Sequence, residues 1–249
     1  MSILDSIVEV QDEAPRIVIY GKRGIGKSTL AASFPKPLFL LTEKNAVKGV
    51  KSINITSFEH MWNTVKELLE LPEFPFKTLV IDSVSNLDAM ISNYILEKET
   101  KASTLAAACG GYGAGYMKAA SLHRALKDKI EELQARGVSI VYIGHLSVKT
   151  HKSPELEDYD IYTIVACHDK IREVYLDDSD AVLFCRQKSF ISETESGRSL
   201  VKSTKQRIIT TGVSEVNVSK NRFDMPDDIS MSFDDIAKYI PFYQTKDDL

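Results

Sequence analysis

Short apolar runs alternate along the chain with longer segments whose apolar residues recur every three or four positions. The runs at 16–20, 37–42 and 76–81 suit strands that are covered on both faces, as in a parallel sheet. After Ser57, apolar residues at this helical spacing predict an amphipathic helix that the serine caps. Strands that alternate with helices in this way predict an α/β fold with a mainly parallel sheet between helices.

The second half of the chain continues the alternation and then changes character. A glycine-rich stretch at 100–116 and a polar stretch at 147–163 are expected to be loops. Beyond residue 188 the pattern predicts short antiparallel strands, which form a β-rich C-terminal extension. The remaining predicted elements are a short strand at 51–56, helices at 84–99, 117–136 and near 167–177, strands at 138–143 and 181–185, and the later strands at 189–194, 199–204 and 206–211.

Composition narrows the class of protein. The formal net charge of −4 argues against nucleic-acid binding by bulk positive charge but leaves room for a local basic surface. No apolar run approaches the roughly 18–20 residues of a membrane span, and the first residues do not read as a secretion signal. Cys109, Cys167 and Cys185 are too widely spaced for a disulfide framework or a zinc site. We therefore expect a cytoplasmic protein, in the host cytoplasm if it is phage-encoded, with no membrane partner.

One motif carries most of the functional information. Residues 21–28 match the pattern G-x-x-x-x-G-K-[ST] directly between a buried strand and a helix. Glycines let successive backbone N–H groups turn toward phosphate oxygens, and the helix start favours the anion. The pattern predicts that the lysine bridges the β- and γ-phosphates and that Ser28 binds Mg²⁺. The expected nucleotide-binding residues are Gly21, Lys22, Arg23, Gly24, Ile25, Gly26, Lys27, Ser28 and Thr29.

Polar residues at the ends of three further strands are candidates for the same site. Asp82 closes the strand at 76–81, where a carboxylate can hold magnesium beside the phosphate loop; alternatively it only caps a helix. Glu43 follows the strand at 37–42 and could deprotonate the attacking water, or it could simply begin a helix. His145 ends the strand at 138–143 and could sense the γ-phosphate, or it could be a histidine satisfied at a strand terminus.

These pieces, in this order, resemble the RecA-type core ATPases. The resemblance rests on Asp82-Ser83 after an apolar strand, followed by a loop, a helix, a strand with a polar end and a second loop. Here His145 stands where that family usually has glutamine. The resemblance spans roughly residues 15–228 and implies a RecA-like P-loop core that uses ATP and Mg²⁺. The chain is most similar to a phage-encoded subfamily, some members of which are RecA-like single-strand annealing proteins. This similarity rests on Tyr-Gly after a glycine pair, Gly-His at the strand end and Lys-Asn-Arg before a proline.

The resemblance also implies partners. The segment Lys220-Asn221-Arg222 resembles one that reaches the nucleotide of the neighbouring subunit, so Lys220 and Arg222 are expected to act in trans within a homo-oligomer; the alternative is a solvated basic turn. The two loops would face single-stranded DNA, and single-strand-binding or other recombination proteins are possible partners. The candidate DNA contacts are Tyr112, Tyr116, Lys149 and Lys152. Acidic residues at 155–160 argue against this role, and both stretches could be no more than mobile loops.

We expect a domain at 15–228, preceded by an N-terminal segment at 1–14 for possible subunit contacts and followed by an acidic segment at 229–249. The first functional hypothesis is an ATP-hydrolysing protein that binds single-stranded DNA and promotes annealing or recombination. An oligomeric ATP-dependent switch that recruits a protein partner without DNA is the second hypothesis, favoured by the acidic net charge. A helicase or packaging motor is the third, and it is disfavoured because no accessory domain is recognised.

Overall fold

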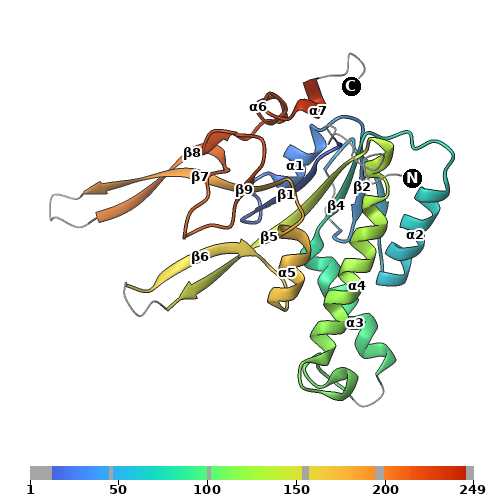
Figure 1. The fold of residues 1–249 in the computed structure, drawn as a ribbon. Helices are drawn as coiled ribbons and strands as arrows, with labels where there is room; N and C mark the ends of the chain where they lie inside the picture. Colours follow the sequence, from blue (N-terminus) through green and yellow to red (C-terminus); the bar gives the residue numbers. More distant parts are fainter. Residues whose placement is uncertain (1–12, 45–46, 100–101, 153–156, 194–198, 245–249) are drawn as a thin grey trace, which may run out of the picture.

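A single twisted sheet forms the centre of the protein, with helices on both faces (Figure 1). The computed structural model describes residues 13–44, 47–99, 102–152, 157–193 and 199–244. Its strands follow the order β10-β8-β7-β1-β5-β4-β2-β3, and those from β7 to β3 are parallel. The expected α/β fold with antiparallel C-terminal strands is thereby confirmed. The parallel strands are β1 (Arg16–Gly21), β2 (Pro37–Leu41), β3 (Lys51–Asn54), β4 (Thr78–Asp82), β5 (Ser139–His151) and β7 (Ala181–Glu193).

Two separate apolar cores hold the helices to the sheet. On one face, residues such as Tyr142 and Ile81 pack against four helices, and on the other, residues such as Val141 and Val80 pack against three shorter ones. The buried parts of β1, β2, β4, β5 and β7 therefore supply alternate side chains to the two cores, which is why their sequences are apolar runs. The first group is α2 (Phe58–Glu70), α3 (Val84–Lys98), α4 (Ala114–Glu131) and α5 (Asp169–Leu176); the second is α1 (Lys27–Ala32), α6 (Phe233–Ala237) and α7 (Pro241–Gln244).

Several elements differ from the sequence-based expectation. The expected loop at 147–163 is largely a β-hairpin, because β5 continues to His151 and pairs antiparallel with β6 (Tyr159–Ile164). The three short strands expected after residue 188 are two long ones, β7 and β8 (Ser199–Thr210), with a register shift between Gln187 and Ser189. In the first case, polar residues such as Lys149 and Thr150 lie on a paired strand and are exposed, so polarity alone suggested a loop.

The glycine-rich stretch expected as a mobile loop is partly packed. Within it, η2 (Ala108–Gly110) forms a short 3-10 helix, and Leu105 is buried against the first turn of α4. A Cβ at Gly115 would lie 2.1 Å from the Leu105 carbonyl oxygen, so glycine is required for this close approach. Consequently α4 begins at Ala114, three residues before the expected start at 117. It ends at Glu131, and the separate 3-10 helix η3 (Gln134–Arg136) follows.

The C-terminal residues complete the second core. After β9 (Lys220–Asn221), strand β10 (Asp228–Ser230) pairs with β8, and Ile236, Ile240 and Tyr243 are buried beneath the sheet. The Tyr243 hydroxyl donates a hydrogen bond to Ser139 Oγ at 2.9 Å. Residues 229–244 therefore pack on the same sheet as the preceding chain. Across the described ranges, no helix combines the length and apolar character needed to cross a membrane.

Candidate nucleotide site

The phosphate loop lies at the carboxyl end of β1, between β5 and β7. Gly26, at its end, has φ +108°, a left-handed conformation that an L side chain rarely adopts. The Lys27 side chain is buried, and its ammonium donates hydrogen bonds to the carbonyl oxygens of Gly21 at 2.9 Å and Lys22 at 3.2 Å. Burial lowers the pKa of Lys27, partly offset by Cys185 and Asp82. A buried cation whose short contacts, among the described residues, are to neutral carbonyls is well suited to receive a phosphate anion.

Ser28 and Asp82 meet beside the loop. The Ser28 hydroxyl donates a hydrogen bond of 2.6 Å to Asp82 Oδ2, although 54 positions separate the two residues. Burial raises the pKa of Asp82, while the Ser28 hydrogen bond acts in the opposite direction. A hydroxyl and a carboxylate at this separation fit Mg²⁺, which takes few protein ligands and completes its shell with water and phosphate oxygens. The described residues accordingly contain no group of three or more His, Cys, Asp or Glu side chains that could hold a metal alone.

Glu43 lies on the same edge of the sheet and is held by two donors. Ser83 Oγ donates to Glu43 Oε1 at 2.7 Å, and His145 Nε2 lies 2.5 Å from the same oxygen. Burial alone would raise the pKa of Glu43, but the hydrogen bonds from Ser83 and His145, together with the nearby charges of His145 and Arg23, lower it. The carboxylate is therefore ionised and oriented before any ligand arrives, as a general base requires.

The turn that carries Glu43 is tied to the end of β4. Thr42 Oγ1 donates to the Ser83 carbonyl oxygen at 2.9 Å and accepts from the Ser83 N–H at 2.8 Å. Ser83 also caps α3, accepting from the Asn86 N–H at 3.3 Å. The peptide bond between Asp82 and Ser83 is cis. Ser83 thus links Asp82, the start of α3 and Glu43. Sequence reasoning missed this role, because nothing in the local sequence indicates the contact between Ser83 and Glu43.

His145 occupies the strand between the phosphate loop and Asp82. In register it pairs with Gly21 on β1, and Ile143 two residues earlier pairs with Asp82 on β4. Its backbone N–H donates to Ser85 Oγ at 3.0 Å. Nδ1 of its ring is buried without a hydrogen-bond partner among the described residues. His145 contacts Glu43 directly, so a change in the position of one side chain affects the hydrogen bond of the other.

A single hollow of about 350 Å³ brings the candidates together. The sequence-predicted residues Glu43, Asp82 and His145 line it beside the loop, together with Arg207 of β8, which sequence reasoning missed. Arg207 is 164 positions beyond Glu43 in the chain and lies in no recognisable motif. Only the pairing of β7 with β8 places it here. The hollow is lined by Arg23, Gly24, Gly26, Lys27, Ser28, Thr29, Glu43, Asp82, His145 and Arg207.

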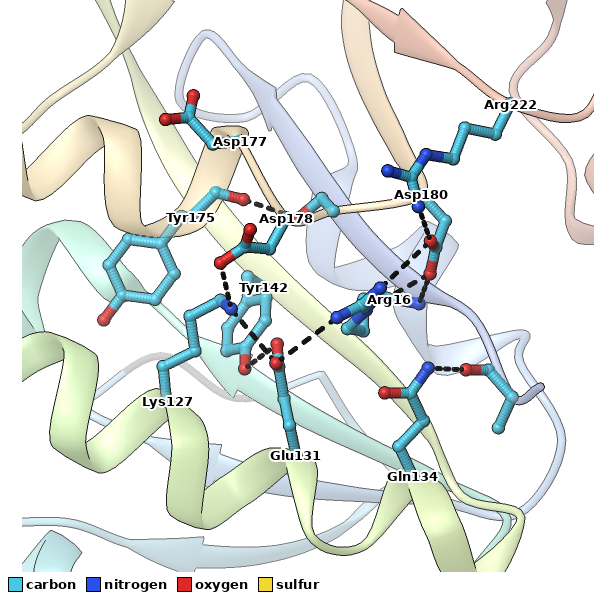
Figure 2. Close-up of polar contacts among 12 residues, drawn as sticks. Arg16, Lys127, Glu131, Gln134, Tyr142, Tyr175, Asp177, Asp178, Asp180 and Arg222 are labelled. Carbon is cyan, nitrogen blue, oxygen red and sulfur yellow. Dashed lines mark hydrogen bonds and ion pairs between the residues drawn. The ribbon is translucent and has the colours of Figure 1, made fainter. Parts of the chain in front are cut away.

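Lys220 and Arg222 lie elsewhere. Strand β9 pairs with the first residues of β7, at the opposite end of the parallel strands from the phosphate loop. Arg222 forms an ion pair with Asp180 at 3.0 Å, and Arg16 contacts the same carboxylate from the other side at 3.3 Å, as Figure 2 shows. The Lys220 ammonium donates to the Asp177 carbonyl oxygen. Within its own subunit neither side chain reaches the phosphate loop, and action on a neighbouring subunit stays a prediction.

The four candidate DNA contacts differ in their surroundings. Tyr112 is fully exposed and Lys152 is exposed, whereas Tyr116 is half-buried and stacks on His168, with ring centroids 5.2 Å apart. Lys149 forms an ion pair with Asp169. His168 and Asp169 are consecutive residues at the start of α5, so this helix start lies between the glycine-rich stretch and the hairpin. Tyr112 and Lys152 are the more accessible pair.

The fold and the site define a P-loop nucleoside triphosphatase with a strand, β5, between its phosphate-loop strand and its Asp strand. The model of the AAA domain family matches residues 13–223, and the chain belongs to this family as an AAA-type P-loop ATPase. It is also similar to an SPbeta prophage-derived uncharacterized protein, YorG, of Bacillus subtilis (strain 168), with 24% identity over 227 residues. The match covers 89% of this chain and 64% of that relative, so this chain spans less than two thirds of its length.

Proposed function

We propose that the protein hydrolyses ATP with magnesium and uses Glu43 as the general base. The observation that carries this proposal is the hollow in which the Glu43 carboxylate faces the phosphate loop beside Ser28 and Asp82. Lys27 and Arg207 would supply positive charge to the phosphates, and Glu43 would accept the proton of the attacking water. Magnesium bound by Ser28 and Asp82 would neutralise phosphate charge.

Two substitutions test the chemistry. Lys27→Ala should abolish tight ATP binding, because the buried phosphates lose their main fixed counter-charge. Glu43→Gln should bind ATP normally and hydrolyse it roughly 100-fold or more slowly, the usual contribution of a general base. The control is Glu67→Gln on the exposed face of α2, which should behave like the unaltered protein. Normal turnover by Glu43→Gln would remove Glu43 from the mechanism.

We further propose that the ATPase acts on single-stranded DNA in annealing or recombination. This is supported by the exposed ring of Tyr112 and by strand β5, which runs without interruption from His145 into the hairpin that bears Lys149 and Lys152. Single-stranded DNA should raise ATP turnover and should bind less tightly as salt increases. Tyr112→Ala should weaken DNA binding by roughly 5- to 150-fold if a base stacks there, whereas Tyr112→Phe keeps the ring and should not.

A gel shift at low salt, together with ATPase assays, decides between the functional hypotheses. Turnover that is indifferent to DNA, with no gel shift, would overturn the DNA proposal. Under that outcome, a mass that changes with ATP in light scattering supports the protein-recruiting switch, which the net charge of −4 favours. Strand separation by this chain alone would support a motor.

We also propose that Lys220 and Arg222 complete the site of a neighbouring subunit in a homo-oligomer. Their support is their position: both cations lie at the end of the sheet far from their own phosphate loop, on the surface formed with Asp177 and Asp180. The double variant Lys220→Ala/Arg222→Ala should bind ATP and hydrolyse it poorly. Mixing it with Lys27→Ala should restore part of the activity, because some interfaces then combine an intact loop with intact cations. No recovery on mixing would indicate a solvated basic turn.

A further inference from the structure

The extensions of β5 and β7 border a hollow beside the phosphate loop. Both strands pair in parallel with β1, which ends at Gly21, and both continue past that point (Figure 1). Neighbouring strands lie about 4.8 Å apart, so the two extensions are separated by roughly 10 Å where β1 no longer lies between them. We call this opening the hairpin hollow. Its volume is about 380 Å³, within the range of small-molecule sites.

Part of the lining of the hairpin hollow is aromatic. Tyr162 of β6 and Phe184 of β7 both line it, and their rings stack with centroids 5.5 Å apart and an interplanar angle of 19°. Phe184 stacks in turn on the buried ring of Tyr20, with centroids 4.9 Å apart, so the rings are anchored in the core. Tyr162 is the half-buried outer member of the three. Anchored aromatic rings of this kind form a surface against which a nucleobase packs well.

The charge of the hairpin hollow favours an anion. Lys22 and Arg186 line it, and no Asp or Glu is among the described residues that do so, although the chain has a net charge of −4. Arg186 is ion-paired with Asp228 at 3.2 Å, whereas Lys22 is exposed and forms no ion pair with a described residue. Gln187 and Ser189 add exposed neutral hydrogen-bonding groups. Rings beside a cation without a carboxylate partner match the base and the phosphate of a nucleotide.

The ATP site leaves the Lys22 side chain unused. The motif places Lys22 in the phosphate loop, but this residue does not line the hollow of about 350 Å³ that faces Lys27. Lys22 lines the hairpin hollow, while its backbone carbonyl oxygen accepts a hydrogen bond from the Lys27 ammonium at 3.2 Å. Leu146, the residue after His145 in β5, lines the hairpin hollow as well. A ligand there would contact the segments that carry Lys27 and His145 without occupying the position of ATP.

We propose that the hairpin hollow binds one nucleotide unit outside the ATP site, with its base against Tyr162 and its phosphate at Lys22. Two sources share this chemistry: a residue within single-stranded DNA and a free nucleoside monophosphate. The first source rests on the proposed action on single-stranded DNA, and the second does not.

Binding measured with the ATP site filled separates the hairpin hollow from that site. The full chain is saturated with magnesium and the non-hydrolysable imido analogue of ATP, and is then titrated with oligothymidylate or with thymidine 5′-monophosphate. Gln187→Glu places a carboxylate in the hairpin hollow and should weaken binding by roughly 10-fold, because the new charge repels the phosphate. The matched control is Gln206→Glu, which adds the same charge at an exposed position of β8 outside the lining and should bind like the unaltered protein.

The aromatic contact has its own test. Tyr162→Leu removes the ring and should weaken binding by roughly 5- to 150-fold, whereas Tyr162→Phe keeps the ring and should bind normally. Selective weakening by Gln187→Glu with either ligand supports the inference, and the ligand that binds identifies the source. Binding of the monophosphate without binding of oligothymidylate would contradict the proposed action on DNA and leave this inference standing. If neither ligand binds the unaltered protein, or if Gln187→Glu binds as tightly as Gln206→Glu, the inference is wrong, while Lys27→Ala decides the proposed ATPase activity separately.

Discussion

Replacing Ser83 by alanine tests whether the hydroxyl between α3 and Glu43 serves both the fold and the site. The side chain is fully buried, accepts a hydrogen bond from the Asn86 N–H and donates one to Glu43. Loss of an N-cap costs about 1 kcal/mol, and loss of the bond to the carboxylate costs about 1 kcal/mol more. For a chain of this size the sum of about 2 kcal/mol corresponds to a fall in Tm of roughly 4–8 °C.

The same substitution should change the pH dependence of turnover. The Ser83 hydrogen bond is one of the two that keep the pKa of Glu43 below its usual value, so alanine should raise that pKa. A general base with a raised pKa becomes protonated at a higher pH as acid is added. The acidic limb of the ATP turnover profile should therefore move to higher pH. The stability that the ionised Glu43 contributes is present above its unfolded-state pKa and is lost as the pH falls through its folded-state pKa.

A second serine cap supplies the matched control. Ser57 caps α2 in the same manner, accepting from the His60 N–H at 3.1 Å, but contacts no residue of the site. Ser57→Ala should lose only the cap energy of about 1 kcal/mol and should keep the original pH profile. Thermal unfolding and ATPase assays at several pH values measure both effects. If Ser83→Ala is destabilised no more than Ser57→Ala and its pH profile is unchanged, the hydrogen bond between Ser83 and Glu43 contributes nothing measurable to stability or to the pKa of Glu43.

Two other substitutions probe the packing around the sheet. Glu131→Gln should lower the free energy of unfolding by about 3 kcal/mol, because buried Lys127, 3.0 Å from Glu131, loses its closest counter-charge. Urea unfolding measures this loss. The control is Glu132→Gln, whose side chain is 53% exposed, and an equal loss in the two variants would refute the explanation. Gly21→Ala should cost roughly 3 kcal/mol, since the new Cβ would lie 2.3 Å from the Cys185 carbonyl oxygen. Gly49→Ala, with nothing within 4 Å, controls for the left-handed backbone alone, and equal losses in thermal unfolding would contradict the steric explanation.

The parts of the site that sequence predicts are those that lie next to strand ends. Residues 21–28 combine a motif with a strand before it and a helix after it, and Glu43, Asp82 and His145 each follow an apolar run. Parallel strands bring their carboxyl ends to one edge of the sheet, so a residue that directly follows a strand in the sequence is expected to lie at that edge. The alternation of strands with helices likewise predicted the mainly parallel sheet.

Long-range contacts are what the sequence does not reveal. Arg207 reaches the phosphate loop only because β8 folds back along β7, and Ser83 reaches Glu43 only because β4 lies beside β2. The hairpin at β5–β6 was missed because many of its residues, such as Lys149 and Asp160, are exposed and show no apolar run. Pairing between strands, rather than local residue preference, determines these features.

Strand β5 is continuous from Ser139 to His151, with His145 at its midpoint. Its first half lies between β1 and β4, while its second half pairs, among the described strands, with β6 alone (Figure 1). The six residues beyond His145 form an extended arm of about 20 Å. A tilt of about 5° at the histidine would therefore swing the far end of that arm by roughly 2 Å. The ring that touches the Glu43 carboxylate therefore lies at the base of this arm, on the same continuous strand.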